Sequence, residues 1–147
     1  MFLTSLNCYD VPRHFTDEEK RNKFRLIVAP SDSSEASLAR EANGPAPIRA
    51  QLRVYASLVQ PGVSIAHGFH PTSSPDLRKA YIHVIQKSGY NPGQPSGAML
   101  RVGAQVNGPM IELREGDGAY LLVGKEAELK VENAGECEAE FLLFDME

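Results

Sequence analysis

The amino-acid sequence predicts an all-β fold, a jelly-roll barrel of short antiparallel strands with one short helix near the N-terminus. Three observations support this prediction. Residues 48–59 alternate between apolar and polar side chains, as a strand with one buried face does. Turn-forming sequences such as Asn107-Gly108 and Gly116-Asp117-Gly118 separate short apolar segments in the second half of the chain. No helical periodicity exceeds two turns.

The predicted helix begins at Thr16. The segment Thr16-Asp17-Glu18-Glu19 has the spacing of a capping box, in which the threonine hydroxyl accepts a bond from an early helix amide and the second glutamate reaches back. The helix is expected to run to about Phe24. Residues 24–29 are expected to form a strand that ends at Pro30, and residues 31–47 form a polar connecting loop.

The remaining strands follow from alternation and from the turns between them. In the strand at residues 80–86, Tyr81 and His83 share one face, and Ala80 and Ile82 share the other. The turn at residues 112–118 is expected to be a solvated, salt-linked corner in which both glycines adopt positive φ. The other expected strands cover residues 63–67, 98–106, 111–113, 119–123, 128–132 and 138–144.

Length and composition predict a single intracellular domain. The 147 residues divide into an N-terminal arm at 1–30 and one domain at 31–147. The net charge of −4 is spread along the chain, which predicts no binding face for nucleic acid or an anionic membrane. No apolar run approaches the ~20 residues of a membrane span. Cys8 and Cys137 are far apart in the sequence and lack metal-ligand spacing, so we expect two free thiols and a cytoplasmic location, with a disulfide between them as the alternative.

Several segments together resemble a known family. The chain is similar to the C-terminal cupin domain of fungal-type pirin-like and quercetin 2,3-dioxygenase-like bicupin proteins, here as a stand-alone single cupin. The resemblance implies a cupin jelly-roll β-barrel, also called a double-stranded β-helix. It also implies the half of the two-barrel architecture that has usually lost its metal ligands. The segments that carry the resemblance are residues 14–23, 78–85, 88–91, 115–120 and 140–145.

The metal motif of this family is incomplete in the chain. A metal cupin needs a sequence such as G-x5-H-x-H-x3,4-E followed by G-x5-P-x-G-x2-H, so that three imidazoles and a carboxylate converge. Here His67 and His70 are three positions apart, no glutamate follows at the expected distance, and Tyr120 stands near the place of the last histidine. We therefore expect no cofactor. If iron, nickel, copper or manganese is bound, its ligands are expected to be His67, His70 and His83.

Without a metal, chemistry would depend on a pocket with a positioned acid or base. His83 and His67 are the candidate catalytic residues because imidazole titrates near neutral pH, and Arg53 could stabilise negative charge on an enolate or carbonyl oxygen. The alternative is that the polar side chains face solvent and the tyrosines only pack. The residues expected to bind a substrate with carbonyl or phenol groups in the same cavity are Gln51, Tyr55, Tyr81 and Tyr120.

Three functions of different class remain open. The first is a metal-independent, pirin-like cupin that binds a small organic molecule in its barrel, as an isomerase or cyclase of a secondary-metabolite pathway. The second is a metal-dependent, quercetinase-like dioxygenase, and the third is a non-catalytic interaction module. A single barrel of two-barrel ancestry would expose apolar surface. This predicts a homodimer, in which residues 1–30 cross to the partner or cover a sheet edge.

Overall fold

The computed structural model describes residues 13–39, 43–71, 77–89, 97–104, 108–124 and 126–146. Within these ranges the chain forms one short helix and ten strands. In chain order they are α1 (Asp17–Lys20), β1 (Arg25–Pro30), β2 (Ala46–Ile48), β3 (Leu52–Val59), β4 (Ser64–Gly68), β5 (Arg78–Val84), β6 (Met99–Gly103), β7 (Ile111–Arg114), β8 (Gly118–Val123), β9 (Glu128–Asn133) and β10 (Ala139–Met146).

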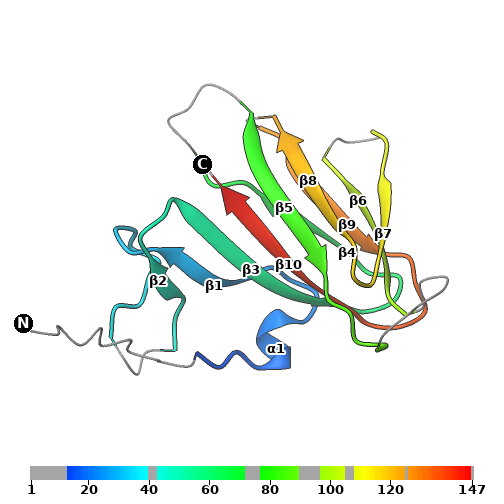
Figure 1. Ribbon diagram of the computed structural model, residues 1–147, viewed down its shortest axis with the longest axis horizontal. Helices are drawn as coiled ribbons and strands as arrows, with labels where there is room; N and C mark the ends of the chain where they lie inside the picture. Colours follow the sequence, from blue (N-terminus) through cyan, green and yellow to red (C-terminus); the bar gives the residue numbers. More distant parts are fainter. Residues whose placement is uncertain are drawn as a thin grey trace, which may run out of the picture.

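The strands form two sheets with the core between them. The larger sheet has the order β2-β1-β3-β10-β5-β8, and the smaller has the order β4-β9-β6-β7. In Figure 1, β3, β10 and β5 lie side by side, with β8 beyond β5. Only β1 and β2 pair in parallel among the described strands. No hydrogen-bonded strand pair joins the two sheets within the described ranges, so the predicted jelly roll is an open two-sheet arrangement there and not a closed barrel.

The core consists of alternate residues from facing strands. The two faces of β5 separate as the alternation predicted. Ala80, Ile82 and Val84 point inward, whereas Tyr81 and His83, which were expected to line the cavity, point outward. β10 contributes from the same sheet, and β6 and β9 contribute from the opposite one. The other buried core residues are Val59, Ala98, Leu100, Val102, Leu113, Leu129, Val131, Ala139, Phe141 and Leu143.

The capping box at Thr16 is present as predicted. Thr16 Oγ1 accepts the Glu19 N–H at 3.4 Å, and the Thr16 N–H donates to Glu19 Oε2 at 2.8 Å. The helix ends at Lys20, earlier than predicted. Asn22 adopts a left-handed φ of 54° and its N–H donates to Leu58 O at 2.6 Å. The chain therefore joins β3 by its backbone instead of continuing the helix.

Residues 48–59 differ from the single predicted strand. Ile48 ends β2, the chain bends at residues 49–51, and β3 follows. On β3 the face expected to be polar points inward, with Arg53 and Ser57 only 6% and 0% exposed. The apolar face is also buried, with Val54, Ala56 and Leu58 at 6%, 6% and 1% exposed, so the prediction of a core face and a polar face holds only in part. Alternation shows that two faces differ but not which one meets the second sheet.

The turn between β7 and β8 confirms part of its prediction. Gly116 adopts a positive φ of 86°, and Arg114 and Glu112 form an exposed ion pair at 2.7 Å. Gly118 has no positive φ. A Cβ at this position would lie 2.0 Å from the hydroxyl oxygen of Tyr81, so the glycine makes room for a side chain on the neighbouring strand.

Glu115 is buried, although a solvated corner was predicted. Its carboxylate accepts the backbone N–H groups of Ser88 at 2.9 Å and of Ala98 at 3.3 Å. Burial raises the pKa of Glu115, but bonds from the Ser88 hydroxyl, from the Ser88 and Ala98 amides and from the Lys87 amide lower it further. The pKa therefore lies below its ordinary value. A single carboxylate ties β5, β6 and the β7–β8 turn together.

The predictions about the cysteines and the N-terminal arm can be compared with the structure only in part. Cys137 is a free, exposed cysteine, whereas Cys8, Asn107 and the first twelve residues of the predicted arm lie outside the described residues. Residues 25–30 of that arm form β1 and belong to the larger sheet. In the described ranges, no helix is both long and apolar enough to cross a membrane.

Candidate functional site

Four buried charged and polar side chains meet at one end of the two-sheet core. They come from four strands: Arg53 near the start of β3, His67 near the end of β4, Arg78 at the start of β5 and Asp145 near the end of β10. Their exposed fractions are 6%, 7%, 3% and 1%. The sheet register places Asp145 directly beside Arg53. We call these four residues the polar cluster.

Asp145 is the centre of the polar cluster. Its Oδ1 accepts a hydrogen bond from Arg78 Nη2, and its Oδ2 lies 3.7 Å from His67 Nε2. The backbone N–H of His70 donates to the same Oδ2 at 3.4 Å. Burial raises the pKa of Asp145, but the His67 ring, the Arg78 guanidinium and the His70 amide lower it further, so the pKa lies below its ordinary value. Asp145 is therefore an ionised carboxylate at neutral pH.

His67 is held among aromatic rings. The ring centroids of Tyr55, Phe24 and Phe69 lie 4.5, 5.0 and 5.1 Å from that of the imidazole. The distance of 3.7 Å from Nε2 to Asp145 is too long for an ordinary hydrogen bond. Nε2 is buried and has no hydrogen-bond partner among the described residues. Buried nitrogens are normally paired, so this one is an exception that needs an explanation.

Tyr55 and Arg53 line the β3 side of the polar cluster. Arg53 Nε donates to Glu35 Oε2 at 2.7 Å. Burial raises the pKa of Tyr55 to about 12, with help from the negative charges of Asp145 and Glu35 and against the positive charges of Arg53 and Arg78. The Tyr55 hydroxyl therefore keeps its proton at neutral pH and can act as a hydrogen-bond donor.

The structure places the seven predicted site residues in three locations. Tyr81 and His83 lie on the outer face of the larger sheet, with their rings stacked at a centroid distance of 6.4 Å, and Tyr120 on the same face is 63% exposed. Gln51 is exposed, and its Nε2 donates to Asp32 Oδ2 at 3.2 Å. The seven side chains therefore do not line one cavity. Those at the polar cluster are Arg53, Tyr55 and His67.

The three histidines of the alternative metal set do not converge. His67 points into the core from the smaller sheet, whereas His83 points away from the core on the larger one. His70 is exposed, and its Nδ1 lies 3.0 Å from Pro71 O. In the part of the chain that the structure describes, no three His, Cys, Asp or Glu side chains are grouped to hold a metal ion. This donor set does not fit a metal centre.

Sequence reasoning did not select Asp145 or Arg78. Asp145 shares the inward face of β10 with Phe141 and Leu143, and Arg78 precedes the inward Ala80 on β5. A charged residue in register with an apolar face is costly to bury unless it has a partner, so this pattern was the available signal. The identity of the partner is visible only in the folded chain.

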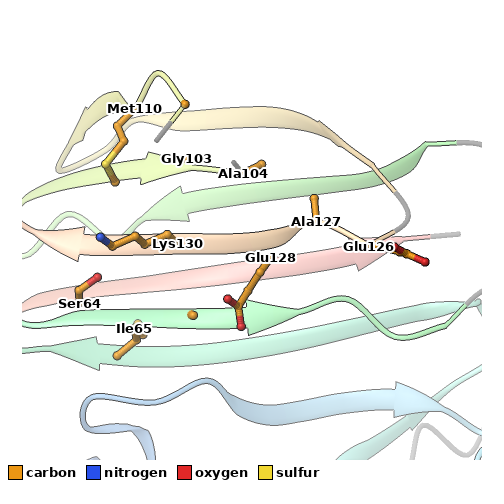
Figure 2. A pocket seen from close by; sticks show the side chains of 11 residues that line it. Ser64, Ile65, Gly103, Ala104, Met110, Glu126, Ala127, Glu128 and Lys130 are labelled. Atoms are coloured by element: carbon orange, nitrogen blue, oxygen red, sulfur yellow. The ribbon is translucent and has the colours of Figure 1, made fainter. Parts of the chain in front are cut away.

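A separate hollow of about 840 Å³ lies along the smaller sheet (Figure 2). It forms where Ser64, Ala66 and Gly103 present little or no side chain, and Glu128 and Lys130 border it. None of the polar cluster contributes to it. The full lining is Ser64, Ile65, Ala66, Gly103, Ala104, Gly108, Met110, Glu126, Ala127, Glu128 and Lys130.

The two facing sheets and their strand order are those of the double-stranded β-helix, so the chain has a cupin fold. The sequence matches no protein-family model and no curated protein. Among solved structures the chain is similar to YhhW from Escherichia coli, with a TM-score of 0.59 and 16% identity over 92% of this chain and 42% of YhhW. The chain therefore spans about two fifths of the length of YhhW.

Other similar structures carry the cupin name. One is an RmlC-like cupin with a double-stranded β-helix fold from Methanocaldococcus jannaschii, with a TM-score of 0.44 and 9% identity over 65% of this chain and 69% of that one. Another is a cupin-superfamily sugar phosphate isomerase from Silicibacter pomeroyi, with a TM-score of 0.41 and 16% identity over 67% and 52%. These similarities concern the fold alone. The closer resemblance to the second cupin of pirin-like proteins stays a prediction.

Proposed function

We propose that this cupin-fold chain binds a small planar molecule with carbonyl or phenol groups at the polar cluster, and that His67 moves a proton on it without a metal, as an isomerase or cyclase does. One observation carries the proposal. His67 is 7% exposed and lies 3.7 Å from the ionised Asp145, and its buried Nε2 has no hydrogen-bond partner among the described residues. An imidazole beside a carboxylate is suited to general acid–base chemistry near neutral pH.

The neighbours of His67 have distinct roles in this proposal. His67 takes a proton from the carbon next to a carbonyl group and returns it to a different atom of the same molecule. Asp145 positions the ring and stabilises its protonated form. Tyr55, which keeps its proton at neutral pH, donates a hydrogen bond to the enolate oxygen that forms in between. Phe24 and Phe69 offer ring surfaces against which a planar molecule can pack.

The other predicted catalytic residues enter differently. Arg53 supplies positive charge beside Tyr55, although its ion pair with Glu35 already uses one of its donors. His83 has no part in the proposal, because it lies on the outer face of the larger sheet. The quercetinase-like alternative requires the metal set His67, His70 and His83, which the geometry does not assemble. His83 therefore provides a matched control for His67.

Binding can be tested with two probes that carry both functional groups, quercetin and 4-hydroxyacetophenone. A ligand at one hundred times its Kd stabilises the folded state by about 2.7 kcal/mol. For a chain of this size this raises the Tm by about 5 to 10 °C. His67→Gln should reduce the shift, and His83→Gln should retain it. No shift with either probe, or an equal shift in both variants, would contradict binding at the polar cluster.

Proton transfer can be tested without knowledge of the natural substrate. In deuterated buffer, a base at the polar cluster should exchange the methyl protons of 4-hydroxyacetophenone, and NMR measures their loss directly. We expect faster exchange with the wild-type chain and with His83→Gln than with His67→Gln, which should fall to the rate in buffer. If a probe binds but its proton exchange is not accelerated, the chain is a binding protein and the proposed proton transfer by His67 is refuted.

A further inference from the structure

Among the described strands, β8 is an edge strand of the larger sheet and carries none of the features that usually protect such an edge. Its sequence Gly118-Ala119-Tyr120-Leu121-Leu122-Val123 has no charged residue and no proline, and β8 ends the strand order. Natural edges usually carry such features to prevent pairing with other chains. The edge strand β2 has three residues and contains Pro47, and the edge strand β7 has two charged residues among four. The edge strand β4 presents only small outward side chains, Ser64 and Ala66.

The outward face of β8 is apolar and exposed. Tyr120 is 63% exposed and Leu122 is 61% exposed. The same face continues onto β5 and β10, where Tyr81 and Phe144 are half-buried with ring centroids 6.1 Å apart and Leu142 lies nearby in register. A solvated sheet face is normally polar. On this face apolar side chains lie beside the exposed Lys79, which is in register with Leu122, and pairing along β8 would extend the apolar part.

The backbone groups of β8 that face away from β5 belong to Gly118, Tyr120 and Leu122, and no described strand pairs with them. The Val84 N–H donates to Asp117 O at 2.9 Å, and this pair continues the register of β5 with β8. In an antiparallel ladder, the bonded positions alternate along each strand. Ala119 and Leu121 therefore turn their backbone groups toward β5, and Tyr120 and Leu122 turn theirs toward the free edge.

We propose that β8 pairs with the β8 of a second copy of this chain, antiparallel and around a two-fold axis at Leu121. An antiparallel pair of identical strands is self-complementary, so one strand supplies both sides of the interface. The axis at Leu121 places Tyr120 opposite the partner's Leu122 and forms about four backbone hydrogen bonds. Moving the axis to Tyr120 would place Leu122 opposite the partner's Gly118 and lose this apolar pairing. The self-matching row of Tyr120 and Leu122 favours a second copy over an unrelated strand.

The test is the mass of the full chain in solution by sedimentation equilibrium. The wild-type chain should reach about twice its single-chain mass of 16.1 kDa at 200 µM. Leu122→Lys adds a charge to the edge and should remain a single chain at this concentration. The control is Leu38→Lys, because Leu38 is an equally accessible leucine, 72% exposed, in the loop after β1. This control should keep the doubled mass, and circular dichroism should show that both variants fold.

Amide hydrogen exchange locates the interface independently of any variant. The Tyr120 and Leu122 amides of the wild-type chain should exchange at least tenfold more slowly at 200 µM than at 2 µM. A single-chain mass at 200 µM overturns the proposal, as does an equal mass for the two leucine variants. A doubled mass without protection of the Tyr120 amide also overturns it, because the copies then meet at another surface. If Leu122→Lys does not fold, the comparison of amide exchange at 2 µM and 200 µM in the wild-type chain tests the proposal without the variant.

Discussion

Asp145→Asn tests whether the polar cluster is a buried electrostatic unit. The substitution preserves the shape of the side chain and removes its charge. Arg78, only 3% exposed, then loses the carboxylate that its Nη2 contacts, and His67 loses the anion 3.7 Å from its Nε2. Removing one partner of a buried ion pair costs about 3–5 kcal/mol when the other charge is left uncompensated, and Arg78 keeps a further interaction, so we expect a loss toward the lower end of this range. For a chain of this size, the Tm should fall by about 6 to 20 °C.

Urea denaturation followed by circular dichroism measures the loss. The matched control is Glu112→Gln, which breaks an ion pair to Arg114 of 2.7 Å between side chains that are 44% and 42% exposed. An exposed pair contributes about 0–1 kcal/mol, so the two substitutions should differ several-fold in their effect on the free energy of unfolding. The double variant Asp145→Asn with Arg78→Met should lose less than the sum of the single losses, by about 0.5–3 kcal/mol.

The pH dependence has a defined sign. The pKa of Asp145 in the folded chain lies below its ordinary value of 3.8, so the carboxylate contributes its full stability above pH 3.8 and loses it as the pH falls through the folded pKa. Titration of the Asp145 carboxyl should therefore add no pH dependence to the difference between wild type and Asp145→Asn above pH 5. A loss below 1 kcal/mol, or additive losses in the double variant, would refute the reasoning about burial.

Two further predictions concern the β7–β8 turn. Gly118→Ala should lower the midpoint of urea unfolding, because its Cβ would lie 2.0 Å from the Tyr81 hydroxyl oxygen, whereas Gly68→Ala enters open space and should change little; equal midpoints would contradict this. Glu115 has a folded pKa below its ordinary 4.5, so its contribution is lost as the pH falls through the folded value. Glu115→Gln should flatten the free energy of unfolding below pH 4.5, and an unchanged acid slope would exclude this role.

Several features that depend only on residues close together in the sequence were predicted correctly. The capping box at Thr16 depends on one side chain three residues away, and it is present. The grouping of Ala80 with Ile82 on one face of β5, and of Tyr81 with His83 on the other, follows from alternation alone. The turn glycine Gly116 has the positive φ that its sequence indicates. These contacts are short in sequence, so no knowledge of the second sheet is needed.

The prediction of the site was less complete because its contacts are distant in sequence. Asp145 meets Arg78 across 67 positions, and the hydrogen bond from His70 spans 75. Tyr81 and His83 fit the chemistry of a pocket as well as Tyr55 does, and only the packing of the sheets places them on the outer face. Residue type identified candidate site residues, but it could not show which of them lie together in the folded chain.

The sequence by itself determined the strands of β5 to β10, the capped helix and the all-β class, because alternation, turn residues and capping act over a few positions. Only the tertiary structure decided which face of β3 is inside, and therefore that Arg53 and Tyr55 meet His67. Burying a charge is favourable only beside a partner, and that partner is selected by how the two sheets pack. The same packing left β8 as an apolar edge, which no single strand sequence reveals.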